Sequence, residues 1–242
     1  MLGLLDSGVG GLTVAKALRT LRPTADLCYL ADEANAPYGT KAVAELLPIL
    51  EKGVRTLLAR GADRVVLACI TASCLYPHLP RSIAPRVIPI LPFVAREIAA
   101  CGGRVGMIAT EATVKSAALS QALSALGCQR TVEKQAAQPL VALAEAGRTD
   151  IADPEVRQVL EAAVSPLVLR GVDTLVLGCT HFPYFESAIR SLYGGLRILS
   201  PARIAAEALS RTLPDECFAG EGRCIYLVSN RARPLRHAAR KA

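Results

Sequence analysis

Two short stretches of this chain share one pattern, and that pattern constrains the fold more than any other feature of the sequence. Residues 63–71 and 173–181 each run from an aspartate through an apolar segment to a small residue and a cysteine, Cys69 or Cys179. Continuous apolar runs of this length are typical of strands buried on both faces of a parallel sheet. We therefore predict two buried strands, one in each half of the chain, each ending in a thiol. If the halves are related by pseudo-symmetry, the two thiols flank one cavity.

Strand-like and helix-like segments alternate along the whole chain. The predicted strands are residues 1–5, 26–30, 65–68, 87–91, 104–109, 174–177, 197–199 and 224–228. The predicted helices are residues 12–19, 42–60, 92–102, 113–125, 139–146, 154–169 and 202–213, and residues 69–73 are predicted as a loop. This alternation predicts an α/β fold with parallel sheets and right-handed crossovers. We place a change of domain near residue 92 and expect residues 224–228 to return to the first domain.

The composition fits a folded globular protein with a large core. The chain has 242 residues, of which 52% are hydrophobic, enough for one large domain or two of ordinary size. Its apolar runs are far too short to cross a bilayer, and the N-terminus shows no charged leader with a cleavage site. We therefore expect no membrane partner and a location in the cytoplasm.

The eight cysteines are scattered over predicted strands, helices and loops. There is no Cys-x-x-Cys pair, and the chain has only three histidines. This pattern fits neither a disulfide framework nor a zinc site, so we predict no bound metal. Most of the thiols are expected to be buried packing groups.

The formal net charge of +7 is unevenly placed along the chain. The C-terminal tail carries Arg231, Arg233, Arg236, Arg240 and Lys241. A basic tail is commonly solvated surface. Nucleic acid is not favoured as a partner, because no recognition motif accompanies the tail and only 4% of the residues are aromatic.

Two loops that follow predicted strands are candidates for binding a ligand. Residues 6–11, Asp-Ser-Gly-Val-Gly-Gly, stand between a strand and a helix, where free backbone N–H groups bind a carboxylate or a phosphate. The dinucleotide fingerprint would require a glycine in place of Thr13, so a small carboxylate needs fewer assumptions than a nucleotide. The second loop contains Pro37, Tyr38 and Gly39, and it is either an ordinary turn or a ligand-binding loop.

Two thiols at matching positions suit proton transfer at opposite faces of one substrate. A stabilised thiolate acts as a general base, and the other thiol acts as a general acid. Asp6 and His181 stand where they could orient the thiols, although a helix cap and a structural hydrogen bond are commoner roles for such residues. Ser7, Thr71 and Thr180 could hold a carboxylate, and no metal or cofactor is required.

Four segments of the chain resemble, in order, the signature segments of the glutamate racemases. They are Asp6-Ser-Gly-Val-Gly-Gly-Leu12, Pro37-Tyr-Gly39, Cys69-x-Thr-Ala-Ser73 and Gly178-Cys-Thr-His-Phe-Pro183, accompanied by Thr110-x-x-Thr113 and Glu145. The resemblance covers nearly the whole chain and extends to the family of cofactor-independent aspartate and glutamate racemases. It implies two pseudo-symmetric α/β domains, each with a mostly parallel sheet flanked by helices, and an active site in the cleft between them. The first domain would comprise residues 1–92 and 204–242, and the second residues 93–203.

The resemblance also implies an isomerase that racemises glutamate by a two-base mechanism. In that scheme Cys179 takes the α-proton of the L-enantiomer while Cys69 gives a proton to the opposite face. Asp6 assists Cys69, and His181 with Glu145 assists Cys179. The positions that match substrate-binding residues are Asp6, Ser7, Pro37, Tyr38, Gly39, Ile70, Thr71, Thr180 and His181. The D-glutamate formed would supply peptidoglycan synthesis in cell-wall biogenesis, and a homodimer is a candidate assembly.

Ile70 departs from the family pattern, in which an asparagine follows the first catalytic cysteine and touches the charged end of the amino acid. Isoleucine can neither donate nor accept, so a hydrogen bond to a charged group, worth about 1.5–3 kcal/mol, is missing. This leaves open a related racemase or isomerase that acts on aspartate, a hydantoin or a less polar acid. It also leaves open a non-catalytic regulatory paralogue that binds a partner through the basic tail.

Overall fold

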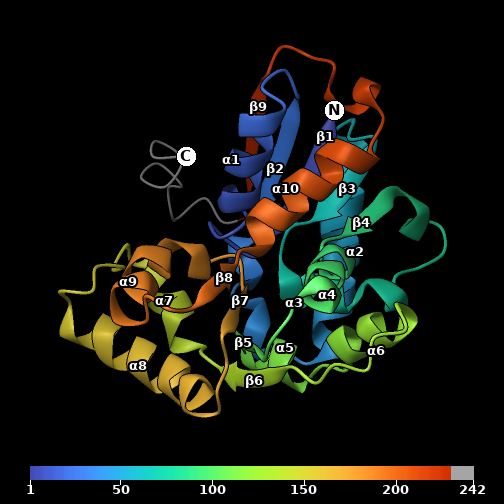
Figure 1. The fold of residues 1–242 in the computed structure, drawn as a ribbon. Coiled ribbons are helices and arrows are strands. Elements are labelled where there is room, and N and C mark those ends of the chain that lie inside the picture. Colours follow the sequence, from blue (N-terminus) through green and yellow to red (C-terminus); the bar gives the residue numbers. More distant parts are fainter. Residues whose placement is uncertain (230–242) are drawn as a thin grey trace.

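The computed structural model describes residues 1–229 and contains two parallel sheets (Figure 1). The strands are β1 (Leu2–Asp6), β2 (Leu27–Ala31), β3 (Arg64–Leu67), β4 (Val87–Pro89), β5 (Val105–Ala109), β6 (Glu133–Ala136), β7 (Thr174–Gly178), β8 (Arg197–Leu199) and β9 (Cys224–Val228). The first sheet has the order β4-β3-β1-β2-β9 and the second the order β6-β5-β7-β8. Every pair of neighbouring strands is parallel. The predicted α/β fold with parallel sheets is therefore confirmed.

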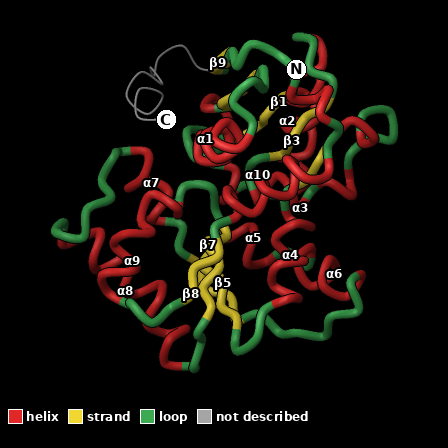
Figure 2. The backbone as a smooth tube through the Cα atoms, turned by 45° about the horizontal axis from the view of Figure 1, so that its top comes forward, coloured by secondary structure: helices red, strands yellow, loops and turns green. Residues whose placement is uncertain are grey.

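Helices separate the strands and cover the sheets, as Figure 2 shows in a second view. They are α1 (Leu12–Leu21), α2 (Val43–Ala59), α3 (Ile70–Cys74), α4 (Leu91–Ala100), α5 (Glu111–Lys115), α6 (Ala118–Ala125), α7 (Pro139–Glu145), α8 (Pro154–Leu169), α9 (Glu186–Leu192) and α10 (Pro201–Thr212). The 3₁₀ turns of the described part are Glu33–Asn35, Tyr38–Thr40, Tyr76–His78, Ala84–Arg86, Phe182–Phe185 and Asp215–Phe218. α2 packs its apolar face on β1, β2 and β3, whereas α8 packs on β5 and β6. α10 lies along α1 and also contacts α4.

The last described strand returns to the first sheet, as the sequence predicts. β9 pairs in parallel with β2, with Leu27 opposite Cys224. Beside the start of β9, Arg223 forms an ion pair with Asp26 at 2.7 Å. The first sheet thus combines residues 2–89 with 224–228, and the second spans residues 105–199. Domain limits of 1–92 with 204–242, and of 93–203, remain a proposal that this division of the strands supports.

Four local features differ from the predictions, and one of them is the helix α9, which was not predicted. The segment after Cys69, predicted as a loop, forms the short helix α3, and Cys69 is its N-cap. The single helix predicted over residues 113–125 is two helices, α5 and α6, because the backbone at Ser116 is extended. β6 was not predicted, because its sequence Glu-Lys-Gln-Ala has no apolar pattern and it forms the edge of its sheet.

The structural description stops before the basic tail. The tail arginines and Lys241, with their predicted role in binding a partner, lie outside the described residues. Within residues 1–229, no helix combines the length and the apolar character needed to cross a membrane.

Candidate active site

Residues with reactive or polar side chains gather at the carboxyl ends of neighbouring strands. In the first sheet β1 ends at Asp6, and the adjacent strand β3 is followed closely by Cys69. In the second sheet β5 is followed by Thr110, and the adjacent strand β7 by Cys179. Open α/β sheets bind ligands at this edge. The two thiols therefore occupy equivalent positions in the two sheets.

One cavity is lined by residues from both halves of the chain. About 250 Å³ of space free of protein atoms, part of it open to solvent, lies at this place. The residues lining it are Ser7, Pro37, Tyr38, Gly39, Cys69, Thr71, Thr110, Gln138, Val141, Cys179, Thr180 and His181. The two cysteines are each 5% exposed. A molecule held between the two thiols is thus largely shielded from bulk water.

The surroundings of Cys69 keep its sulfur neutral. Burial raises the pKa of Cys69 well above its usual value, and the negative charges of Asp6 and Cys179 raise it further. Hydrogen bonds from the backbone of Ala72 and from Thr71 oppose this shift without cancelling it. Cys69 is therefore a protonated thiol at neutral pH, which is the form that can give a proton.

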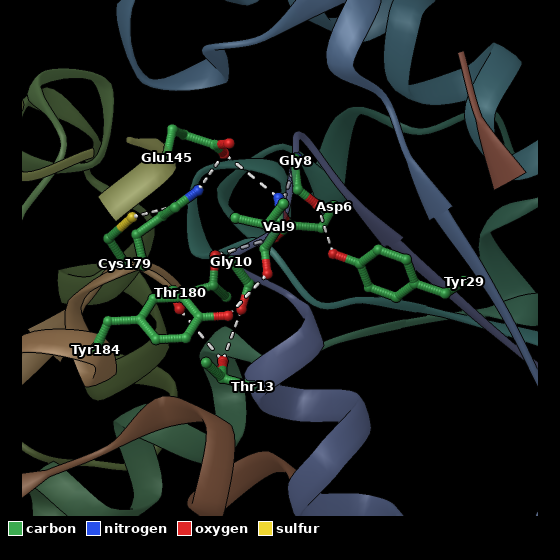
Figure 3. A network of polar contacts seen from close by, with 11 residues as sticks. Asp6, Gly8, Val9, Gly10, Thr13, Tyr29, Glu145, Cys179, Thr180 and Tyr184 are labelled. Atoms are coloured by element: carbon green, nitrogen blue, oxygen red, sulfur yellow. Dashed lines mark hydrogen bonds and ion pairs between the residues drawn. The ribbon is translucent and has the colours of Figure 1, made fainter. Parts of the chain in front are cut away.

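Cys179 lies beside a positively charged histidine. Its Sγ atom is 3.6 Å from Nδ1 of His181, and Nε2 of His181 is 2.6 Å from a carboxylate oxygen of Glu145 (Figure 3). Burial alone would lower the pKa of His181, but the hydrogen bonds to Cys179 and Glu145 raise it well above its usual value. The imidazolium donates from both ring nitrogens, to the sulfur and to the carboxylate. This arrangement stabilises a thiolate at Cys179.

Asp6 connects the two halves of the site. It is fully buried and accepts hydrogen bonds from the backbone N–H of Gly8 at 2.9 Å and from the hydroxyl of Thr180 at 3.0 Å. Burial raises the pKa of Asp6, although the charge of His181 and these hydrogen bonds oppose the shift. The carboxylate thus holds Thr180, the residue that follows Cys179, and its charge also raises the pKa of Cys69.

The glycine-rich loop packs directly on the segment that carries Cys179. The backbone N–H of Val9 donates to Glu145 at 3.4 Å, and the Thr13 hydroxyl donates to the backbone oxygen of Thr180 at 3.2 Å (Figure 3). A Cβ atom at Gly10 would lie 2.5 Å from the Thr180 hydroxyl oxygen, so glycine is required for this close approach. N–H groups of the loop bind the chain's own carboxylates, Asp6 and Glu145, and the predicted binding of a ligand carboxylate by this loop stays a prediction.

Three threonine hydroxyls form a buried cluster beside the cavity. Oγ1 of Thr71 lies 3.0 Å from Oγ1 of Thr110 and 3.1 Å from Oγ1 of Thr113. Thr110 and Thr113 are also in contact at 2.9 Å. Two members, Thr71 and Thr110, line the cavity, and together the hydroxyls can orient their protons toward a carboxylate.

The Pro37-Tyr38-Gly39 segment forms part of the cavity wall. The ring of Tyr38 is buried, and its hydroxyl donates to Asp32 at 2.7 Å, so the phenol is already occupied by a partner. A Cβ atom at Gly39 would lie 2.6 Å from both Oε1 of Gln138 and Cβ of Thr110. The backbone of Gly39 therefore lies against the second half of the chain, which a larger residue would push away.

The structure brings most of the predicted site residues together at this cavity. Asp6 and Glu145 do not line it but bind residues that do. Ile70 is fully buried and is absent from the cavity wall. Gln138 and Val141 line the cavity and were missed from the sequence, because a glutamine between an edge strand and a short helix carries no pattern that indicates a ligand.

The arrangement suits proton transfer between two thiols. One sulfur is a neutral donor, the other lies 3.6 Å from the His181 imidazolium, and the threonine hydroxyls can donate to a carboxylate. Within residues 1–229, no group of three or more His, Cys, Asp or Glu side chains is placed to hold a metal ion.

The family model of the Asp/Glu/Hydantoin racemases matches residues 13–209. A glutamate racemase of Desulforudis audaxviator is 39% identical over 214 residues, which are 87% of this chain and 76% of that protein.

Solved structures resemble the whole chain. The glutamate racemase of Thermus thermophilus, in complex with β-chloro-D-alanine, has a TM-score of 0.85 and 31% identity and covers 99% of this chain and 91% of its own. The glutamate racemase of Francisella tularensis, in complex with D-glutamate, has a TM-score of 0.86 and 25% identity, with coverage of 97% and 89%.

Proposed function

This chain belongs to the Asp/Glu/Hydantoin racemase family, and we propose that it interconverts L- and D-glutamate by proton transfer between Cys69 and Cys179. The observation that carries the proposal is that two thiols line one cavity, and that each follows an equivalent strand in one of the two sheets. The family match indicates a racemase, and the similarity to glutamate racemases over most of the chain favours glutamate as the substrate.

The proposed reaction moves one proton off and one proton onto the α-carbon. The Cys179 thiolate, stabilised by the His181 imidazolium, takes the α-proton of L-glutamate, and the electron pair left behind is delocalised into the α-carboxylate. The neutral thiol of Cys69 then gives its proton to the opposite face, which forms D-glutamate. Cys69 ends as a thiolate and Cys179 as a thiol, the state from which the reverse reaction starts.

The remaining residues would bind and orient the amino acid. Ser7 suits the substrate ammonium, because it lines the cavity and can accept a hydrogen bond, whereas Asp6 would act through Thr180, whose hydroxyl it binds at 3.0 Å. The hydroxyls of Thr71, Thr110 and Thr180 suit a carboxylate, because each can donate. Glu145 would act through His181, whose ring it holds at 2.6 Å.

Aspartate, a hydantoin or a less polar acid is not favoured as the substrate. Those alternatives rested on Ile70, which does not line the cavity. A non-catalytic role is not favoured either, because both thiols and the groups that set their charge are in place. The D-glutamate formed would serve peptidoglycan synthesis. A homodimer and a location in the cytoplasm stay predictions of the sequence.

The test is exchange of the α-hydrogen in deuterated water. L-Glutamate incubated with the protein should gain α-deuterium and yield D-glutamate, both followed by mass spectrometry and chiral chromatography. The double variant Cys69→Ser/Cys179→Ser, with wild-type circular dichroism, should do neither. The proposal is refuted if folded wild-type protein exchanges the α-hydrogen of neither enantiomer.

A further inference from the structure

Gln138 places a side-chain amide in the cavity wall without a protein partner. It stands between β6 and α7 and lines the cavity together with Gly39 and Thr110. Its Oε1 atom is fully buried, and none of the residues 1–229 makes a hydrogen bond to it. A buried amide oxygen without a hydrogen-bond partner destabilises a protein, so packing alone does not explain why a glutamine stands at this position.

The position of Gln138 along the sheet edge defines which part of a substrate it can reach. The second sheet has the order β6-β5-β7, and these strands are followed by Gln138, Thr110 and Cys179 in turn. Neighbouring strands are about 4.7–4.9 Å apart, so the backbone at Gln138 is roughly 10 Å from that at Cys179. When the α-carbon of a bound amino acid lies beside Cys179, its α-carboxylate is too close to Cys179 to reach Gln138. The end of a longer side chain of the same amino acid can extend toward Gln138.

The neighbours of Gln138 indicate a negatively charged ligand group. Oε1 faces the backbone of Gly39 and lies beside Thr110, whose hydroxyl belongs to the threonine cluster. Among residues 1–229, no acidic side chain lines the cavity. A glutamine amide exchanges its oxygen and nitrogen by a half-turn about its last torsion, at little steric cost. The amide can therefore turn either atom toward the cavity, and Nε2 donates to a carboxylate when it is the atom turned there.

We propose that Gln138 binds the side-chain carboxylate of the substrate and thereby selects an amino acid with the length of glutamate. This inference rests on the proposed function. Because the same bond forms before and during proton transfer, Gln138 acts on substrate affinity more than on the rate of the chemical step.

The experiment compares Gln138→Leu and Gln138→Glu with the wild type. Loss of a hydrogen bond to a charged group corresponds to a roughly 10- to 100-fold weaker interaction. Gln138→Leu should raise KM for glutamate by about that factor, with kcat changed less than about threefold. Gln138→Glu should bind still more weakly, because two carboxylates repel. Gln158→Leu, on the exposed face of α8, is the matched control and should leave both constants unchanged.

Calorimetry separates this inference from the proposed function. D-Glutamate should bind Gln138→Leu more weakly than the wild type, whereas D-2-aminobutyrate, which lacks the side-chain carboxylate, should bind both equally. These titrations need no turnover, so they decide the role of Gln138 even if the wild type fails to racemise glutamate. Equal affinity for D-glutamate, an equal loss for both ligands or tighter binding by Gln138→Glu would each overturn the inference. Circular dichroism must show wild-type folding of each variant.

Discussion

The carboxyl ends of β3 and β7 each carry a cysteine, yet the two thiols have opposite electrostatic surroundings. Cys69 is buried near the carboxylate of Asp6, and burial together with that charge raises its pKa. Cys179 lies 3.6 Å from His181, an imidazolium held by Glu145. The same residue type at equivalent positions thus lies beside a carboxylate at one end and beside a cation at the other.

This difference shows that the repeated architecture sets the positions of the two cysteines, whereas their neighbouring residues decide which thiol acts as the acid and which as the base. Two parallel sheets place a thiol on each side of one cavity. Two neutral thiols would lack a base, and two thiolates would lack an acid and repel each other. The unequal neighbours solve both problems. The predictions below test whether the two ends differ in this way.

Replacing either thiol should have the largest effect. A positioned general acid or base contributes about 10²–10⁴-fold to a rate, so Cys69→Ser and Cys179→Ser should each lower kcat/KM for racemisation by that factor. Polarimetry with each enantiomer measures it. Cys128→Ser, partly exposed and outside the cavity, should remain fully active. More than a tenth of wild-type activity in either catalytic variant would contradict the two-thiol mechanism.

Removing the charge beside Cys179 should make the two ends more alike. His181→Asn keeps a polar amide near the sulfur but loses the cation, so we expect kcat/KM to fall roughly 10- to 100-fold, the value of a charged hydrogen bond. The exposed His78 provides the control variant His78→Asn, which should behave as the wild type. Unchanged kinetics in His181→Asn would show that the Cys179 end does not depend on this cation.

Weakening the support of His181 should shift the pH dependence. The hydrogen bond that His181 donates to Glu145 raises the pKa of His181, so Glu145→Gln should lower that pKa. The imidazolium is then lost at a lower pH, and the alkaline limb of the kcat/KM profile should move to lower pH, with a loss of less than about tenfold at neutral pH.

The control for this shift is Glu155→Gln, whose carboxylate pairs with Arg148 on the surface. Its pH profile should match that of the wild type. A shift of the alkaline limb to higher pH in Glu145→Gln would reverse the sign of the argument and refute it.

Changing Ile70 should alter stability and leave substrate affinity nearly unchanged. Its side chain is fully buried and does not line the cavity, so Ile70→Asn buries an amide and should lower the free energy of unfolding by at least about 1–3 kcal/mol. Urea unfolding measures this, and KM for glutamate should stay within about twofold. Ile70→Leu, similar in volume, should cost less than about 1.5 kcal/mol. A tenfold lower KM in Ile70→Asn would show that position 70 does reach the substrate.

Most of the fold could be predicted, because a strand that is buried on both faces needs a continuous apolar run, and such a run can be recognised within its own segment of the sequence. The run before Cys179 predicts β7 nearly to its ends, and residues 154–169 and 197–199 match α8 and β8. β6 could not be predicted, because an edge strand needs no apolar alternation and is stabilised by its neighbour β5. Nor could α3, because one turn of helix after Cys69 depends on the packing around it.

The sequence by itself determined the order of elements, the two matched strand ends and the resemblance that selected the candidate residues. These follow from patterns within single segments, where burial along one element requires apolar residues at regular spacing. Only the tertiary structure decided which thiol faces an anion and which a cation, that Ile70 is buried outside the cavity wall, and that Gln138 lines it. Those facts depend on distances between segments far apart in the chain, which packing alone sets, and electrostatic interactions change steeply with distance and burial.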